Sequence, residues 1–279
     1  MNLDHGAIIV PLDGSNEAEA VLLPASQLAR AYNAPVEFVH VVDVDSRSAT
    51  PSPELPADRF DAYVASLLGQ SGIRDLEWSA SLLVGAPAET ILEAAAGARV
   101  VVIATHGRGG FHAAFIGSVT DKVVRSSRLP VLTVPVQGQP NLMAGPILVG
   151  LDGSETAEAA LPVVRDLAPR LGVGIGLVRA YSVTPSAGTE FGVYEYDTVT
   201  ILKEGAEEYL KLTAREGETA FTAMTSPAAA IAQAADQLGA GLITLTSHGR
   251  GLAYGLALGS TTDRVIHSVR RPVLVLPSE

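Results

Sequence analysis

The chain has 279 residues, of which 47% are hydrophobic, and its 30 acidic and 19 basic side chains give a formal net charge of -11. This is a globular composition with enough length for two domains of ordinary size. The negative charge and the lack of a Lys/Arg run disfavour nucleic-acid binding. The chain has no cysteine, which excludes disulfides, thiolate metal sites and cysteine nucleophiles.

The N-terminal sequence lacks a basic region followed by a long apolar run, so no signal peptide is expected. No apolar run approaches the ~18 residues of a membrane-spanning helix. The sequence therefore predicts a cytoplasmic protein that has no membrane partner.

In the first half of the chain, short apolar runs alternate with longer segments that have helical periodicity. Residues 7–12 predict a buried strand, and 15–32 predict a helix with Ser15 as its N-cap. Pro24 inside that helix predicts a kink or a division into two pieces. Further strands are expected at 35–42, 75–85, 99–105 and 130–135, and further helices at 57–72, 86–98 and 117–126.

Four segments of the chain occur twice in the same order. The first pair is offset by 139 residues and the other three by 142, which indicates tandem duplication of one domain. We predict domains at 1–138 and 144–279, joined by the Gly- and Pro-containing residues 136–145. The pairs are IIVPLDGS (8–15) with ILVGLDGS (147–154), THGRG (105–109) with SHGRG (247–251), GSVTDKV (117–123) with GSTTDRV (259–265), and LPVLTVP (129–135) with RPVLVLP (271–277).

The second copy repeats the same element pattern. Its strands are expected near 146–151, 173–181, 218–225, 241–246 and 272–277. Continuous Val/Ile/Leu runs are typical of parallel strands that are buried on both faces. The sequence therefore predicts an α/β fold, with a doubly wound, five-stranded parallel sheet in each copy.

The glycine-rich stretch after each fourth strand could bind an oxyanion, because open α/β sheets bind ligands beyond the carboxyl ends of their strands. A helix N-terminus offers unpaired N–H groups, and glycines allow close approach of the backbone. Hydroxyl groups and a positively charged side chain could also contact the oxyanion. These side chains are Ser118, Thr120 and Arg108 in the first copy, and Ser260, Thr261, Thr262 and Arg250 in the second. The alternative is that the glycines only turn a loop and the serines only cap helices.

Asp13 and Asp152 each follow a first strand in the sequence LDGS. Either carboxylate could accept hydrogen bonds from an adenine amine or a ribose hydroxyl. The alternative is a structural turn or helix cap, because Asp-Gly-Ser is turn chemistry. Neither a Walker P-loop nor a dinucleotide G-x-G-x-x-G pattern occurs in the chain.

The spacing of these glycines resembles the nucleotide signature of the universal stress protein family, which is G-x-x-G, nine residues, then G-[ST]. Gly107 and Gly117-Ser118 match it in the first copy, and Gly249 and Gly259-Ser260 match it in the second. The resemblance covers nearly the whole chain. It implies strand order 3-2-1-4-5 in each copy, adenine-nucleotide binding and a regulatory role under stress.

The resemblance also implies positions for the site, with ATP and Mg²⁺ as its ligand. Pro11, Asp13 and the backbone near Val41 would contact adenine and ribose in the first copy, as would Asp152 and Ala180 in the second. Around the phosphates it places Ala104, His106, Gly107, Arg108, Gly109, Gly117, Ser118, Val119 and Thr120 in the first copy, and Gly249, Arg250, Gly251, Gly259, Ser260 and Thr261 in the second.

One departure from the signature concerns its first glycine, which is Ala104 in the first copy and Thr246 in the second. Threonine is larger and branched, so we expect a competent first site and a weaker second one.

Three functions remain open at this point. The first is an ATP-binding regulator with slow hydrolysis or none, and the second is an interaction module whose sites bind no nucleotide. The third is a phosphoryl or nucleotidyl transferase, for which Asp121 and Lys122 are the candidate catalytic residues. His106 and His248 recur, but neither has a second histidine or a carboxylate at metal-ligand spacing, so no metal site is predicted.

Duplication has a further consequence for the edges of the sheet. The two copies can pack about a pseudo-twofold axis, with the last strands (130–135 and 272–277) edge to edge, which hides two apolar edges. The resemblance implies the same pairing, since single-copy members dimerise through this strand. Association of two chains as a homodimer stays open.

Overall fold

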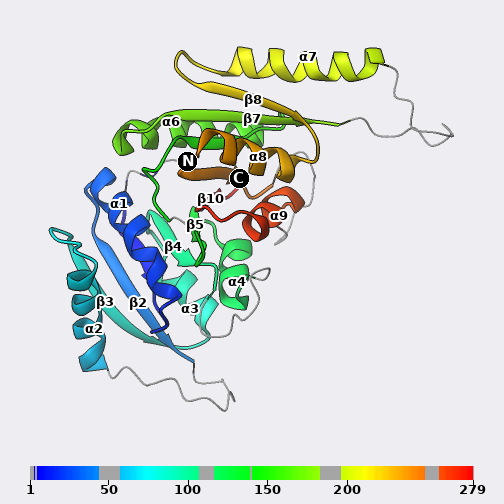
Figure 1. Cartoon of the computed structure of the whole chain (residues 1–279). Coiled ribbons are helices and arrows are strands. Elements are labelled where there is room, and N and C mark those ends of the chain that lie inside the picture. The colour runs from blue at the N-terminus through cyan, green and yellow to red at the C-terminus, as the bar shows by residue number, and fades with distance from the viewer. Residues whose placement is uncertain are drawn as a thin grey trace.

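The protein is described here by a computed structural model, covering residues 3, 5–43, 57–106, 116–138, 140–182, 196–248 and 258–278 (Figure 1). The elements of the first half are β1 (Ile8–Pro11), η1 (Ala18–Val21), α1 (Leu22–Tyr32), β2 (Val36–Val42), α2 (Ala57–Gln70), β3 (Trp78–Val84), α3 (Pro87–Ala94), β4 (Val100–Ala104), α4 (Ser118–Ser126) and β5 (Val131–Val134). Those of the second half are β6 (Ile147–Gly150), α5 (Glu155–Glu158), α6 (Ala160–Leu171), β7 (Ile175–Tyr181), α7 (Tyr196–Thr213), β8 (Thr219–Met224), α8 (Pro227–Leu238), β9 (Leu242–Thr246), α9 (Ser260–Ser268) and β10 (Val273–Leu276).

All of these strands belong to one sheet, in the order β3-β2-β1-β4-β5-β10-β9-β6-β7-β8. Each half therefore has the order 3-2-1-4-5, which confirms the predicted α/β fold. Neighbours within a half are parallel. β5 and β10 pair antiparallel, with Val273 opposite Thr133 and Val275 opposite Val131. The two half-sheets therefore run in opposite directions.

Helices cover both faces of the sheet, and alternate strand residues enter different cores. Ile8 and Val10 of β1 belong to the core beneath α1, α2, α6 and α7, whereas Ile9 belongs to the core beneath α3, α4, α8 and α9. β4 and β9 are buried along their whole length. Burial on both faces explains why these strands are continuous apolar runs in the sequence.

The helix predicted at 15–32 is divided in two, as Pro24 suggested. A short 3-10 helix, η1, is followed by α1, and Pro24 is the third residue of α1. The second half has the same break between α5 and α6, with Pro162 as the third residue of α6. Proline lacks a backbone N–H and is tolerated in the first turn, so each main helix begins just before its proline.

The two halves share one core and several polar contacts. Leu28 from α1, Leu142 from the connection and Leu161 from α6 belong to the same buried cluster. The side chain of Gln27 donates to Asn141 Oδ1 at 2.6 Å and accepts from the backbone N–H of Leu142 at 2.9 Å. The connection between the halves is therefore anchored to α1 at Asn141 and Leu142.

Two charged or aromatic contacts also join the halves. Tyr32 at the end of α1 donates a hydrogen bond to Asp166 of α6 at 2.9 Å. Arg125 of α4 donates to Asp263 of α9 at 2.5 Å, and Figure 1 shows these two helices side by side. Among the helices that the structure describes, none combines the length and the apolar character needed to cross a membrane.

Replacing Gln27 by alanine is expected to destabilise the protein by about 1–3 kcal/mol, because the buried N–H of Leu142 loses its acceptor. The free energy of unfolding in urea measures this. Gln70→Ala is the matched control, because Gln70 is exposed and bonds only to Ser66 of its own helix. Equal stabilities of the two variants would contradict the anchoring role of Gln27.

The ion pair between Arg165 and Glu218 predicts a pH-dependent contribution to stability. Arg165 Nε and Nη2 donate to the two carboxylate oxygens of Glu218, each at 2.8 Å, and the Glu218 side chain is only 7% exposed. The hydrogen bonds from Arg165 lower the pKa of Glu218 from its ordinary value of 4.5, against the opposing effect of burial.

A carboxyl whose pKa is lower in the folded state contributes stability above its unfolded pKa and loses it as the pH falls through the folded pKa. Glu218→Gln should therefore cost about 2–3 kcal/mol at pH 7. The difference from wild type should shrink as the pH falls below 4.5. Urea unfolding of both proteins between pH 7 and pH 3 measures it, and a constant difference across this range would contradict the assignment.

Candidate functional site

The candidate sites lie where the strand order reverses. β1 lies between β2 and β4 in the sheet. The connection after β1 leads to β2 on one side of it, and the chain later returns to β4 on the other side. β6 lies in the same way between β7 and β9. A crevice at the carboxyl ends of such strands is the usual ligand position in an open α/β sheet. Because the strands of the two halves run in opposite directions, the two candidate sites lie at opposite ends of the strands.

The aspartate after each first strand shapes a turn. Asp13 Oδ1 accepts from the backbone N–H of Ser15 at 3.0 Å and from its hydroxyl at 2.5 Å. Asp152 Oδ1 accepts from the N–H and hydroxyl of Ser154 at 2.9 and 2.6 Å. The structural alternative raised by the sequence is therefore realised in both copies. Both aspartates are half-buried and lie at the carboxyl ends of β1 and β6.

The start of the helix after each fourth strand is fixed to the strand end. The N–H of Gly117 donates to the carbonyl of Thr105 at 2.7 Å, and the N–H of Gly259 donates to the carbonyl of Ser247 at 2.7 Å. A Cβ on Gly259 would lie 2.9 Å from that carbonyl oxygen. The φ of each glycine is -60°, which any residue can adopt. Close approach, rather than backbone conformation, therefore requires glycine at position 259.

These glycines, and not the serines, occupy the N-cap positions. Gly117 is the N-cap of α4 and Gly259 is the N-cap of α9, and neither helix start has a side-chain cap. Ser118 and Ser260 are the first helical residues and are exposed, while Val119 and Thr261 are half-buried. The alternative in which the serines only cap these helices is therefore not what the structure shows. The open first turns retain the partial positive charge of a helix N-terminus.

Thr120 has a structural role that the sequence did not predict. Its hydroxyl is buried and donates to the carbonyl of Ala104 at 2.7 Å. Thr262 makes the equivalent bond to the carbonyl of Thr246 at 2.8 Å. Each bond ties a helix to the last residue of the neighbouring strand. The expected role of Thr120 as a hydroxyl donor to phosphate is corrected, because its proton is already engaged.

Within the described part of the chain, His106 and His248 each have a buried nitrogen atom without a hydrogen-bond partner. In His106, Nδ1 lies 3.0 Å from the hydroxyl of Thr105. In His248, Nδ1 lies 3.1 Å from the hydroxyl of Ser278. The Nε2 atom of each histidine is buried and unpartnered. An unpaired buried polar atom is costly, so each ring has an unused hydrogen-bonding position beside the helix start. The repetition of THG and SHG identifies both histidines in the sequence, but only His106 was placed in the predicted site.

The other predicted residues fall into two groups. Pro11 ends β1, Val41 lies next to the end of β2, Ala104 ends β4 and Ala180 lies next to the end of β7, so all four lie toward the carboxyl ends of their strands. The remaining predicted positions lie outside the described residues. They are Gly107, Arg108 and Gly109 in the first copy, and Gly249, Arg250 and Gly251 in the second.

The two copies differ at the first signature position. Ala104 is a small buried residue, whereas Thr246 carries a hydroxyl that donates to the carbonyl of His248 at 2.8 Å. This bond holds the beginning of the second loop in a way that the first copy lacks.

The candidate catalytic residues of a transferase are engaged in ion pairs. Lys122 pairs with Glu89 of α3, and the hydrogen bond from Lys122 lowers the pKa of Glu89. Asp121 pairs with Arg125 one turn further along α4, at 2.8 Å. Within the described residues, no group of three or more His, Asp or Glu side chains could hold a metal ion by itself.

Comparison with known proteins follows the same division of the chain. The model of the Universal stress protein family matches residues 5–135 and again residues 143–277. The chain belongs to the universal stress protein family.

Two relatives in this family match this chain over nearly the whole length of both proteins. A universal stress protein of Mycobacterium tuberculosis is 29% identical over 287 residues, which cover 97% of this chain and 96% of that protein. A second one from the same organism is 25% identical and covers 96% and 95% of the two chains. The crystal structure of a universal stress protein from Archaeoglobus fulgidus superimposes with a TM-score of 0.71 at 20% identity, covering 97% and 98%. At that identity the superposition supports the fold.

Substitution of the two buried threonines tests how the helix starts of this universal stress protein are held. Thr120→Val and Thr262→Val should each lower the free energy of unfolding by about 0.5–1.5 kcal/mol, because a strand-end carbonyl loses its donor. Ser118→Ala, at an exposed position, should change it by less than about 0.5 kcal/mol. Urea unfolding measures all three, and a larger loss in Ser118→Ala than in Thr120→Val would refute the assignment.

Proposed function

We propose that this universal stress protein is a nucleotide-binding regulator that holds ATP, with Mg²⁺, at the switch point of each half. The observation that carries the proposal is the repeated helix start. In both copies a glycine N-cap lies against a strand-end carbonyl, and the first helical turn has no side-chain cap.

The described residues fit an anionic ligand in four respects. The exposed hydroxyls of Ser118 and Ser260 stand at the open helix starts. Uncapped N–H groups and the helix dipole favour a phosphate at these positions. The unpartnered Nε2 atoms of His106 and His248 supply a further hydrogen-bonding position beside each start. A side chain on Gly259 would fill the space between strand and helix.

Each part of the site then has a definite task. The N–H groups of the first turn of α4 and the Ser118 hydroxyl hold phosphate oxygens, with Arg108 as a further cation. The Asp13 turn and the backbone near Val41 receive the ribose and adenine. Mg²⁺ would accompany the nucleotide and neutralise part of the phosphate charge, since this ion is usually bound through substrate phosphates. The second half repeats the arrangement with Ser260, Arg250, Asp152 and Ala180.

The two sites are not equivalent in this proposal. The Thr246 side chain stands where Ala104 stands in the first site and is bonded to the carbonyl of His248. That bond and the added bulk occupy the strand end, where the first site has only the methyl group of Ala104. The first site therefore binds ATP more tightly than the second.

A regulatory role is favoured over phosphoryl transfer. Asp121 and Lys122 each have an ion-pair partner on a helix, so neither is a ready base or phosphate-binding cation. Hydrolysis would then be slow, and occupancy of the site by ATP would itself be the signal in the cytoplasm.

Extraction of bound nucleotide tests this function directly. Freshly purified protein is denatured and removed, and the supernatant is analysed for adenine nucleotides. Released ATP is expected, as is a rise in melting temperature when ATP and Mg²⁺ are added to stripped protein. Absence of both would contradict nucleotide binding, and ADP formed over many turnovers would indicate an enzyme.

Gly117→Val should remove most of the ATP-induced rise in melting temperature, because the new side chain displaces the helix start from the strand end. Gly259→Ala should have a smaller effect, because it alters the weaker site. Gly69→Ala is the control, since a Cβ on Gly69 in α2 meets nothing within 4 Å. Differential scanning fluorimetry with and without ATP separates loss of binding from loss of stability. An undiminished ATP response in Gly117→Val would rule out the proposed cradle.

A further inference from the structure

The free edge of the sheet in the second half lacks the usual protection against strand pairing. β8 is the last strand in the sheet order and has the sequence TAFTAM. Edge strands in soluble proteins usually carry a charge, a proline or a bulge that discourages pairing. Thr219 to Met224 include no charged residue and no proline, so β8 presents an uncharged row of backbone donors and acceptors.

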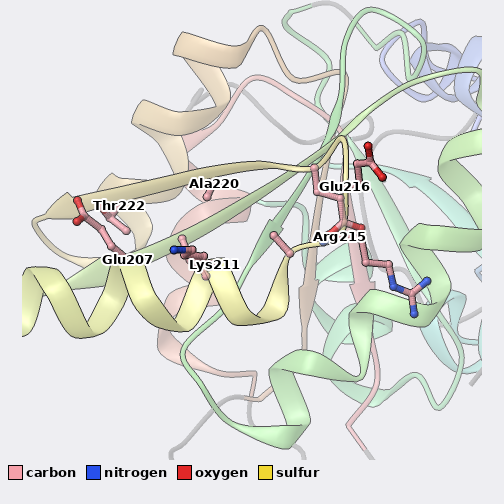
Figure 2. A pocket seen from close by; sticks show the side chains of 9 residues that line it. Glu207, Lys211, Arg215, Glu216, Ala220 and Thr222 are labelled. Carbon is pink, nitrogen blue, oxygen red and sulfur yellow. The ribbon is translucent and has the colours of Figure 1, made fainter.

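A groove of about 460 Å³ follows this edge, between the C-terminal part of α7 and β8 (Figure 2). Ala220 and Thr222 of β8 line it, so their side chains are on the α7 face of the sheet. Phe221 packs on the other face, against the core beneath α8. Glu207 and Lys211 of α7 also line the groove, as do Arg215, Glu216 and Glu218 before β8. Glu207 also forms an exposed ion pair with Lys203 of its own helix, at 3.7 Å.

The spacing of Glu207 and Lys211 along α7 matches the spacing of Thr222 and Ala220 along β8. α7 and β8 are consecutive elements that run in opposite directions. Four helical residues advance about 6 Å, and two strand residues advance about 6.6 Å. The step from Lys211 back to Glu207 therefore matches the step from Ala220 to Thr222. Figure 2 shows Lys211 next to Ala220 and Glu207 next to Thr222.

We propose that two copies of this chain associate by antiparallel pairing of β8 with β8, about a twofold axis that passes through Phe221. In this arrangement Ala220 lies opposite Thr222 of the partner subunit. Lys211 then faces Glu207 of the partner subunit, and the symmetry produces this ion pair twice.

The charges select this register over its neighbours. An axis through Ala220 would bring Lys211 against the partner's Lys211, and an axis through Thr222 would bring Glu207 against the partner's Glu207. Like charges directly opposite each other are destabilising. The axis through Phe221 also places the two Phe221 rings opposite each other, which is a favourable cross-strand pair.

Helix packing is compatible with the same dimer. α7 contacts β7 and β8 to a similar extent, so it lies above the line between them. With strands about 4.8 Å apart, the two α7 helices would lie about 10 Å apart across the new strand pair. This separation is close to the 8–10 Å at which helices pack.

The opposite edge of the sheet lacks this complementarity. Tyr63 of α2 and Tyr209 of α7 occupy equivalent positions, since each donates to a glutamate in the helical segment after the first strand of its half. On that alignment Asp61 and Ala65 stand where Glu207 and Lys211 stand. β3 therefore has no pair of opposite charges to fix a register. Pairing through β8 alone gives a closed dimer instead of an open filament.

Charge reversal tests the register. Lys211→Glu and Glu207→Lys should each weaken the dimer at least about 10-fold, because two symmetric ion pairs become repulsive. The double variant that exchanges the two residues should restore wild-type association. Asp61→Lys, at the equivalent exposed position of α2, should leave it unchanged. Sedimentation equilibrium over a range of protein concentrations measures all four. A monomer at every concentration, or a dimer insensitive to both single reversals, would overturn the proposal.

Cross-linking tests the axis independently of the charges, since the chain has no cysteine of its own. Directly opposite residues have Cα atoms about 4.5–5.5 Å apart, which a disulfide can bridge. Phe221→Cys should therefore form a covalent dimer under mild oxidation. Ala223→Cys should not, because the axis separates the two copies of residue 223 by about 13 Å. Equal cross-linking of the two variants, or none in either, would overturn the axis. Neither experiment depends on nucleotide binding.

Discussion

The hydrogen bond from the Gly117 N–H to the Thr105 carbonyl is the constraint on which the candidate site depends. It fixes the start of α4 against the end of β4, and the bond between Gly259 and Ser247 does the same for α9 at the same length of 2.7 Å. The buried hydroxyls of Thr120 and Thr262 add a second tie between helix and strand. An open helix N-terminus is thereby held at the switch point of the sheet by the fold itself, before any ligand binds.

Duplication places two such sites in one continuous structure. The antiparallel pairing of β5 with β10 converts two parallel half-sheets into one sheet, and residues of both halves share a core. The two sites consequently lie at opposite ends of the strands. α4 and α9 are linked through the hydrogen bond between Arg125 and Asp263. Burial tends to lower the pKa of Arg125, but Asp121 and Asp263 outweigh this and raise it, so the link is charged at any physiological pH.

Much of the fold could be predicted from the sequence because the same pattern of strands and helices occurs in both halves of the chain. Repeated apolar runs identified the strands, and the proline in 15–32 indicated the break between η1 and α1. The positions of Asp13, Gly117 and Gly259 followed from their repetition.

Tertiary partners of individual side chains could not be predicted in the same way. The hydroxyls of Thr120 and Ser118 are two residues apart, yet the first is buried against Ala104 and the second is exposed. Only the placement of the helix beside the strand decides between them. The sequence likewise does not distinguish Gln27 from other polar residues of its helix. Its role depends on the connection between the halves, which folds back so that Asn141 and Leu142 contact it.

The most direct measurement is an NMR titration of the ¹⁵N-labelled protein with ATP and Mg²⁺, following the backbone amides of residues 117–120 and 259–262. The account predicts large shifts for the amides at the start of α4, and shifts at α9 only at higher ATP concentration. Unmoved amides at both helix starts, with shifts elsewhere or nowhere, would contradict it.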